Sequence, residues 1–303
     1  FFYLFFFYLY LFPNFSYTQT VIPEGEISGI WTIDGSPYQI EGNVSVPTDS
    51  TLVIEPGVIV EFQGHYMFLV FGEIYAIGNH NDSIVITIIP ELQEDGWNRI
   101  DIIDEAPSVA DSSVFKFCRF EYGNANNFFD KNYGGALALY AKTYISNCSF
   151  KNNKAQYGGG AIYCDHTDVI IDSCLFENNQ STSAGAILIA GGKVNLSNCI
   201  FSENTSEQTS NSLGVYNGEV SVTHCIFNNN YGGWATIYFT ETSGTYPVQK
   251  FINNIISNNS GGVTGGIIFR GHEDYFANQI IQSNLIVNNV ANGPDALAGG
   301  FII

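Results

Sequence analysis

One pattern of apolar and polar positions is written three times between Val169 and Asn230. Each copy has two apolar residues at alternate positions, followed at fixed offsets by a cysteine, a phenylalanine and an asparagine. The copies recur about every 25 to 26 residues, a period typical of a solenoid whose units must stack to bury their apolar faces. They read Val169, Ile171, Cys174, Phe176, Asn179; Val194, Leu196, Cys199, Phe201, Asn204; and Val220, Val222, Cys225, Phe227, Asn230.

The pattern continues on both sides of these copies. About seven units run from Val114 to the end of the chain, and asparagine replaces cysteine in the last two. The flanking copies read Phe115, Cys118, Phe120; Ile145, Cys148, Phe150, Asn153; Phe251, Asn254, Ile256, Asn259; and Ile281, Asn284, Ile286, Asn289.

The alternation within a unit predicts where the chain turns. Val194 and Leu196 share one face of a strand, but Cys199 would face outward if that strand continued. A bend at residues 197–198 returns Cys199 to the interior, so two short strands meet at a corner. A third strand follows the glycines of each unit, as in Gly185–Ile189. Three strands per unit predict an all-β, three-faced coil.

The cysteines and asparagines of successive units are predicted to stack in two interior columns. A buried thiol acts as a small apolar group. The asparagine amide can bond its equivalent one coil away and tolerates the left-handed conformation of a turn. Asn254 and Asn284 at the cysteine position argue against obligatory disulfides, and no Cys-x-x-Cys or nearby histidine completes a tetrahedral zinc site. The predicted columns are Cys118, Cys148, Cys174, Cys199 and Cys225, and Asn153, Asn179, Asn204, Asn230, Asn259 and Asn289.

The chain from residue 24 to about residue 112 has less regular spacing but clear strand signals. Its apolar runs are bounded by Gly, Pro, Asn or Asp. We expect shorter leading coils here, continuous with the regular repeats of residues 113–303 in one domain, because a solenoid adds coils to one core. The expected strands are Tyr38–Val46, Thr51–Ile54, Val58–Phe62, Met67–Ile77 and Ile84–Ile89.

Composition supports a β-rich scaffold and limits its partners. The 303 residues are 45% apolar and 13% charged, with 31 glycines, a composition that disfavours helices. A formal charge of −19 repels phosphate backbones and anionic headgroups, so we expect no nucleic-acid partner. The acidic surface is compatible with Ca²⁺, although Asp and Glu on turns more often serve only solvation. We expect no other cofactor and no bound metal.

Residues 1–12 form an uncharged apolar block followed by polar sequence. The block is too short for a spanning helix and has the length of the apolar part of an export signal. Residues 1–20 are therefore interpreted as an incomplete export segment, with a membrane anchor as the alternative. Residues 299–303 repeat the start of a third strand, and we expect further coils and a cap beyond them. The mature region is predicted to be monomeric, without a membrane span, and secreted or on the cell surface.

The units with Phe-x-x-Asn, such as Phe150 to Asn153, and with Gly-Gly-Ala-Ile at residues 159–162 resemble those of polymorphic outer-membrane proteins and other autotransporter passengers. More broadly, they resemble the right-handed parallel β-helices of the pectate-lyase-like superfamily. The stretch Leu52–Val58 is similar to leading coils of exported β-helix proteins of environmental bacteria. The resemblance implies a right-handed parallel β-helix of about ten coils.

A leucine-rich repeat is the rival interpretation, because it shares the spacing from Ile171 to Asn179 and also carries an asparagine ladder. Such a repeat would continue with a helical segment, whereas this chain continues with glycine and another β run.

The superfamily hosts lyases, hydrolases and adhesins, so activity needs separate support. A polysaccharide lyase needs an arginine or lysine base beside carboxylates that hold Ca²⁺. The best cluster is Asp165, His166, Asp168 and Asp172, and its Asp-His pair resembles a motif of pectate lyases. Asp165 and His166 are better interpreted as turn residues, because the equivalent position in the next coil is the tight turn Ala190–Lys193. No arginine lies in this unit or its neighbours.

Other candidate chemistry is weaker. A polygalacturonase-type hydrolase needs three converging aspartates, whereas residues 270–274 offer only a Gly-His pair in what reads as an exposed loop. The sequence therefore predicts an adhesin-like or glycan-contacting scaffold, with a lyase or hydrolase of acidic polysaccharide as the alternative. The aromatic residues that could stack on sugars, or simply cover the surface, are Tyr140, Tyr163, Tyr231, Trp234 and Tyr238.

Overall fold

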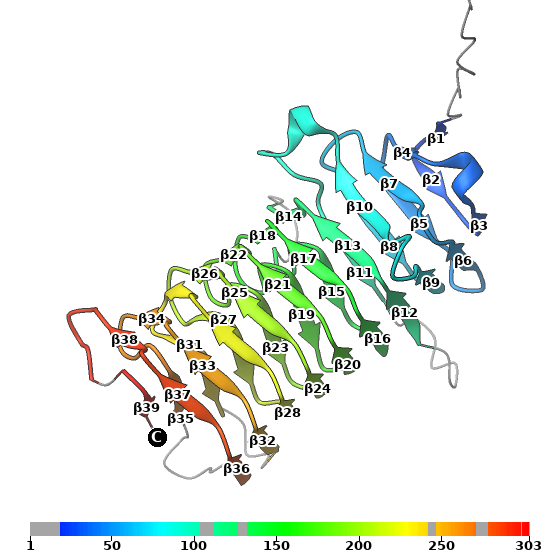
Figure 1. Ribbon diagram of the computed structural model, residues 1–303. Coiled ribbons are helices and arrows are strands. Elements are labelled where there is room, and N and C mark those ends of the chain that lie inside the picture. The colour runs from blue at the N-terminus through cyan, green and yellow to red at the C-terminus, as the bar shows by residue number, and fades with distance from the viewer. Residues whose placement is uncertain are drawn as a thin grey trace, which may run out of the picture.

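The computed structural model describes residues 19–103, 112–126, 132–241, 247–270, 278–297 and 299–302. Figure 1 shows parallel strands wound into one elongated solenoid, from the blue leading coils to the red coils at the other end. The strands form four parallel sheets of 11, 11, 10 and 7 strands, named A, B, C and D below. Two short 3-10 helices, η1 (Ile33–Gly35) and η2 (Pro90–Leu92), are the only helical segments among the described residues.

Sheet A carries the strand that follows each cysteine corner. Its register places the repeat phenylalanines opposite one another, as in the pairing of Phe150 with Phe120 and Phe176. The strands in order are β1 (Thr20–Ile22), β4 (Tyr38–Ile40), β7 (Ile59–Phe62), β10 (Ile84–Ile88), β13 (Cys118–Glu121), β17 (Ser149–Lys151), β21 (Leu175–Glu177), β25 (Ile200–Ser202), β29 (Ile226–Asn228), β33 (Ile255–Ser257) and β37 (Leu285–Val287).

Sheet B contains the strand that follows the glycines of each unit. The strands in order are β2 (Gly25–Glu26), β5 (Val44–Val46), β8 (Phe68–Val70), β11 (Ile100–Ile102), β15 (Leu137–Leu139), β19 (Ile162–Asp165), β23 (Ile187–Ala190), β27 (Ser210–Tyr216), β31 (Ala235–Thr240), β35 (Ile267–Arg270) and β39 (Phe301–Ile302).

Sheet C contains the strand with the two apolar residues that precede each cysteine. The strands in order are β3 (Gly29–Trp31), β6 (Thr51–Ile54), β9 (Glu73–Ile77), β12 (Ser113–Lys116), β16 (Thr143–Ser146), β20 (Asp168–Asp172), β24 (Lys193–Ser197), β28 (Glu219–Thr223), β32 (Val248–Ile252) and β36 (Asn278–Gln282).

Sheet D is a fourth, narrow sheet. The sequence predicted only three strands per coil and therefore missed it. Its strands have two residues each, too few for an alternation to be visible in the sequence. They are β14 (Asn124–Ala125), β18 (Lys154–Ala155), β22 (Gln180–Ser181), β26 (Thr205–Ser206), β30 (Tyr231–Gly232), β34 (Ser260–Gly261) and β38 (Val290–Ala291).

The leading coils contain two corners that the sequence did not reveal. The expected strand Tyr38–Val46 is two strands, β4 and β5, and the expected strand Met67–Ile77 is likewise β8 and β9. The strands on both sides of each corner bury alternate residues in the same interior. The apolar run therefore continues through the corner.

Single residues in left-handed conformation turn the chain from sheet C into sheet A. At the predicted bend, Asn198 has a φ of 55°, and Ser173 and His224 repeat it one coil away on either side. A second left-handed residue lies immediately before each ladder asparagine, so the prediction that the ladder asparagine itself adopts this conformation is wrong. The preceding residue turns the chain, and the ladder side chain is free to point inward. These turning residues are Asn152, Asn178, Glu203, Asn229, Asn258 and Asn288.

The interior is a column of stacked apolar side chains that runs along the solenoid. Its centre is a row of fully buried phenylalanine rings, in which successive rings are nearly parallel and 4.5 to 5.0 Å apart. Such offset stacking adds to the hydrophobic gain of burying each ring. A leucine-rich repeat is excluded, because β-strands fill every face of these coils. The stacked rings are Phe120, Phe150, Phe176, Phe201 and Phe227.

Candidate functional site

Asp165 ends β19, and His166 forms the turn that follows it. Nδ1 of His166 lies 2.5 Å from Oδ1 of Asp165, and the same carboxylate interacts with the phenol of Tyr163. Burial, and then the charge of Asp165, raises the pKa of Tyr163. His166 has a φ of 50° and a side chain that is 80% exposed, with its ring close to Gly191 of the next coil. The pair therefore occupies a surface turn.

Asp168 and Asp172 lie at opposite ends of β20, so the structure does not bring the four predicted residues together. Asp172 accepts hydrogen bonds from Oγ of Ser197 at 2.6 Å, Nδ2 of Asn198 at 2.8 Å and Oγ of Ser173 at 2.9 Å. Partial burial acts to raise the pKa of Asp172, but these three bonds outweigh it and lower the pKa. This carboxylate holds a corner between coils.

The outer surface of sheet B carries a more unusual arrangement. Tyr163 and Tyr238 lie between core residues of their strands and point away from the interior. They are nevertheless only 7% and 4% exposed, because a second layer of side chains covers them. We call this layered surface the aromatic face. It consists of Tyr133, Tyr140, Tyr157, Tyr163, Tyr216, Trp234 and Tyr238.

The rings of the aromatic face form two groups along the solenoid. One group surrounds Tyr163 and the other surrounds Tyr238, with Leu188 on the strand between them. Both groups have the stacked, tilted or edge-to-face geometries that aromatic pairs prefer. The centroid distances are Tyr133–Tyr163 4.7 Å, Tyr133–Tyr157 5.6 Å, Tyr140–Tyr163 6.2 Å, Tyr216–Tyr238 6.2 Å and Trp234–Tyr238 5.8 Å.

Of the rings that the sequence suggested, Trp234 is accessible to a ligand on this face, and Tyr157 is an accessible ring that the sequence did not suggest. Tyr163 and Tyr238 are too buried to stack on a sugar, whereas Tyr157 is 47% and Trp234 41% exposed. Tyr231 is exposed but lies on β30 in sheet D. The sequence signal that could have identified Tyr157 is its position next to glycines, which Trp234 shares, where the chain passes over sheet B.

A pocket of about 590 Å³ opens beside Trp234. Trp234 and Tyr238 line it together with Ile268, and Arg270 and Asp295 supply charged groups. An apolar, partly aromatic wall with a few convergent polar groups is the usual composition of a small-molecule site. The rest of the loop predicted at residues 270–274 lies outside the described residues, as do residues 1–18.

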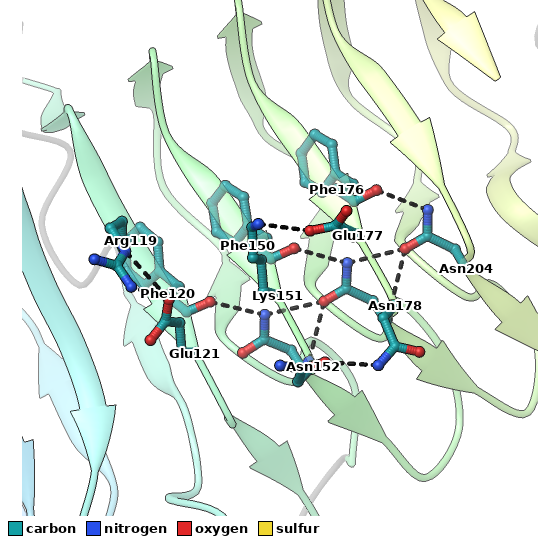
Figure 2. Close-up of polar contacts among 12 residues, drawn as sticks. Arg119, Phe120, Glu121, Phe150, Lys151, Asn152, Phe176, Glu177, Asn178 and Asn204 are labelled. Carbon is teal, nitrogen blue, oxygen red and sulfur yellow. Dashed lines mark hydrogen bonds and ion pairs between the residues drawn. The ribbon is translucent and has the colours of Figure 1, made fainter. Parts of the chain in front are cut away.

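The asparagine column forms a continuous chain of hydrogen bonds. Nδ2 of Asn179 donates to Oδ1 of Asn204 at 2.9 Å and to the carbonyl of Phe150 at 3.0 Å, and its backbone N–H donates to the same Oδ1 at 3.0 Å. Equivalent side-chain bonds connect the column from Asn153 to Asn289. Figure 2 shows the backbone carbonyls of Phe120, Phe150 and Phe176 accepting hydrogen bonds from the side-chain amides of the column. The bonds occupy the amides, so these side chains stabilise the coils.

Across the described ranges, no three His, Cys, Asp or Glu side chains converge as a multidentate metal site requires. No helix in that part of the chain is long and apolar enough to cross a membrane.

Comparison with known proteins agrees with the geometry. A family model for a right handed beta helix region matches residues 106–246. None of the curated proteins and none of the solved structures matches the chain. The matched segment covers most of the regular coils, and the solenoid is a right-handed parallel β-helix.

Proposed function

We propose that this right-handed parallel β-helix is a secreted or cell-surface scaffold that contacts glycans through its aromatic face. The observation that carries the proposal is the exposed ring of Trp234 beside a pocket that also contains Arg270 and Asp295. An exposed indole offers an apolar plane to one face of a sugar ring, while charged groups can bond its hydroxyls. Tyr157 offers a second exposed ring on the same face.

The net negative charge of the chain favours a neutral glycan over an acidic one as the ligand. A formal charge of −19 repels a polyuronate or a sulfated chain at low ionic strength. Neutral glycans meet no such barrier, so we propose a neutral glycan as the ligand. The uncharged apolar block at residues 1–12 motivates the secreted or surface location, together with the resemblance to autotransporter passengers.

A polysaccharide lyase or hydrolase is the second candidate, and the observation that favours it is the contact between Asp165 and His166. Against it, Asp172 lies at the far end of β20, where hydrogen bonds from three side chains hold it. An acid–base pair of this kind needs a second carboxylate converging on the same substrate.

A glycan-binding assay on the chain tests the proposal. We expect a neutral glycan to bind, and Trp234→Ala and Tyr157→Ala to weaken that binding about tenfold or more, the loss of a contact worth about 1.4 kcal/mol. Tyr231→Ala is the matched control, because Tyr231 is equally exposed but lies on sheet D. Unchanged binding by Trp234→Ala would contradict the proposal.

A panel of acidic and neutral glycans, incubated with and without Ca²⁺, separates binding from catalysis. We expect the glycans to be recovered intact. Product formation that Asp165→Ala abolishes would instead support the enzyme.

A further inference from the structure

The five repeat cysteines form a continuous ladder of free thiols inside the β-helix. Each immediately precedes a residue that pairs in sheet A, so all five share one register. The backbone N–H of Cys118 donates to Sγ of Cys148 at 3.4 Å. The thiol of Cys148 interacts with Cys118 and Cys174, and that of Cys199 with Cys174 and Cys225. The ladder is therefore unbroken across five coils.

The ladder is buried but lies directly beneath the surface. A groove of about 450 Å³ follows the corner between sheets C and A, and Cys118, Cys148 and Cys174 are part of its lining. Burial raises the pKa of Cys148 and Cys174, so both are neutral thiols. Their hydrogens point to backbone carbonyls, as in the contact from Sγ of Cys148 to the carbonyl of Ser146 at 3.3 Å.

The spacing of the ladder matches a particular coordination geometry. Sulfurs in the same register on neighbouring parallel strands repeat at about 4.8 Å. A zinc–thiolate bond is about 2.3 Å long, and two metal–sulfur bonds of that order placed end to end span about 4.6 Å. A two-coordinate cation therefore fits between neighbouring sulfurs without moving the coils. A disulfide would instead require the two sulfurs to approach to about 2.04 Å.

We propose that neighbouring thiols of the cysteine ladder bind a soft monovalent cation, Cu(I), in linear two-coordinate sites. Thiolate ligands select Cu(I) over harder ions, and sulfurs arranged in a line cannot surround a tetrahedral zinc ion. Five thiols provide four such sites. Each cation displaces one thiol proton, so four cations release four protons, one thiol keeps its proton, and the interior gains no net charge.

The chain itself supplies a substitution that interrupts the ladder and preserves the fold. One coil beyond Cys225, the position is Asn254, whose Oδ1 accepts the backbone N–H of Cys225 at 2.8 Å. Its Nδ2 donates to the carbonyl of Val222 at 3.0 Å. Sγ of Cys174 already faces the equivalent carbonyl, that of Ile145, at 4.0 Å. An asparagine that replaces a ladder cysteine can therefore form the same hydrogen bonds that Asn254 forms in the native chain.

The test is an anaerobic titration of the reduced chain with Cu(I) in competition with a chromophoric Cu(I) chelator. We expect about four Cu(I) per chain, one proton released per Cu(I), and two sulfur neighbours per copper by X-ray absorption. Cys174→Asn should lower the uptake to two, because it leaves only the pairs Cys118–Cys148 and Cys199–Cys225. Cys225→Asn should lower it to three, and it only extends by one coil the native run of Asn254 and Asn284 at the cysteine position.

Cys164 provides the matched control, because it is a buried thiol on β19 in sheet B, away from the ladder. Cys164→Ala should retain the uptake of the parent chain. Uptake by Cys174→Asn equal to that of the parent, loss of uptake in Cys164→Ala, or binding that requires prior unfolding would each overturn the proposal.

Discussion

The leading coils and the regular coils share sheets A, B and C but close their turns by different means. In the leading coils, Gln39 and the Glu61 it contacts one coil away are only 22 residues apart. Their aromatic contacts are individual ones, such as Trp31 stacked on Tyr38 with centroids 4.5 Å apart. In the regular coils, successive ladder asparagines are 25 to 30 residues apart. The longer coils contain a repeated phenylalanine and a repeated asparagine.

The asparagine ladder begins where sheet D begins. Oδ1 of Asn153 accepts the backbone N–H of Gly123 at 2.9 Å, immediately before β14, the first strand of sheet D. The longer coils therefore add a fourth side, sheet D, to the solenoid. At the turn before sheet D, buried asparagine side chains form hydrogen bonds with the backbone. A buried backbone group without a partner costs free energy comparable to a lost hydrogen bond. The repeated asparagine therefore supplies the hydrogen bonds that the additional turn of the longer coils requires.

The largest effect is expected from an amide removed in the middle of that ladder. Asn204→Ala removes the acceptor of the backbone N–H of Asn179 and of one of its two Nδ2 hydrogens, and it removes the donor to the carbonyl of Phe176. Each buried group left unpaired costs about 1–3 kcal/mol, so we expect a loss of about 3 kcal/mol or more in the free energy of unfolding. Urea unfolding of both proteins measures it.

Asn195→Ala is the matched control for this change. Asn195 lies in β24 of the same coil but is only partly buried, on the outer face. Its loss should change the free energy of unfolding by less than about 0.5 kcal/mol. If the two variants lost equal stability, the ladder would not hold the turn.

The sequence predicted the repeated residues far better than the places where coils depart from the repeat. Cys199, Phe201 and Asn204 were predicted in the interior because the corner at residues 197–198 can be read from the alternation, and the structure buries all three. The inward position of Val220 is occupied one coil later by Gln249, a substitution that the irregular spacing concealed.

The aromatic face shows a second reason why the sequence could not predict the whole structure. The alternation of a strand predicts which side chains leave the interior, but it cannot show that a second layer covers them. Tyr163 and Tyr238 are buried by side chains of turns and of neighbouring strands, such as Leu188 and Ile268. From the alternation alone, the rings of Tyr163 and Tyr238 were expected to be exposed.

A departure from the repeat gives the next prediction, a pH dependence inside the regular coils. Nε2 of Gln249 donates to Oε1 of Glu241 at 2.7 Å, both side chains are buried, and within the described residues Oε2 of Glu241 has no partner. Burial raises the pKa of Glu241 to about 7 from an ordinary value of 4.5. The native state therefore holds the proton more tightly than the unfolded chain.

Because the pKa of Glu241 is higher in the folded state than in the unfolded state, the free energy of unfolding should fall as the pH rises. The stabilisation from protonated Glu241 is fully present below about pH 4.5 and is lost as the pH rises to about 7, a change on the order of 3 kcal/mol. Glu241→Gln should remove this dependence. Other acidic groups also titrate in this range, so the quantity to measure is the difference in unfolding free energy between the two proteins at several pH values. A difference that stays constant from pH 4.5 to 8 would contradict the prediction.

The smallest effect is expected on the outer face of sheet A, where the repeat also aligns charges. Figure 2 shows Lys151 paired with Glu177 on the next coil. Nζ of Lys151 lies 2.5 Å from Oε2 of Glu177, and both side chains are 37% exposed. Water and salt screen such a pair, so Lys151→Met should cost no more than about 0.5 kcal/mol. A double-mutant cycle with Glu177→Gln measures the coupling, which should disappear in 1 M salt, where the screening length is about 3 Å. Because the pair spans the same two coils as the amides of Asn153 and Asn179, the two measurements compare surface and interior contacts of one coil boundary. A coupling as large as the loss in Asn204→Ala would show that charges on the surface hold the coils together as strongly as the ladder.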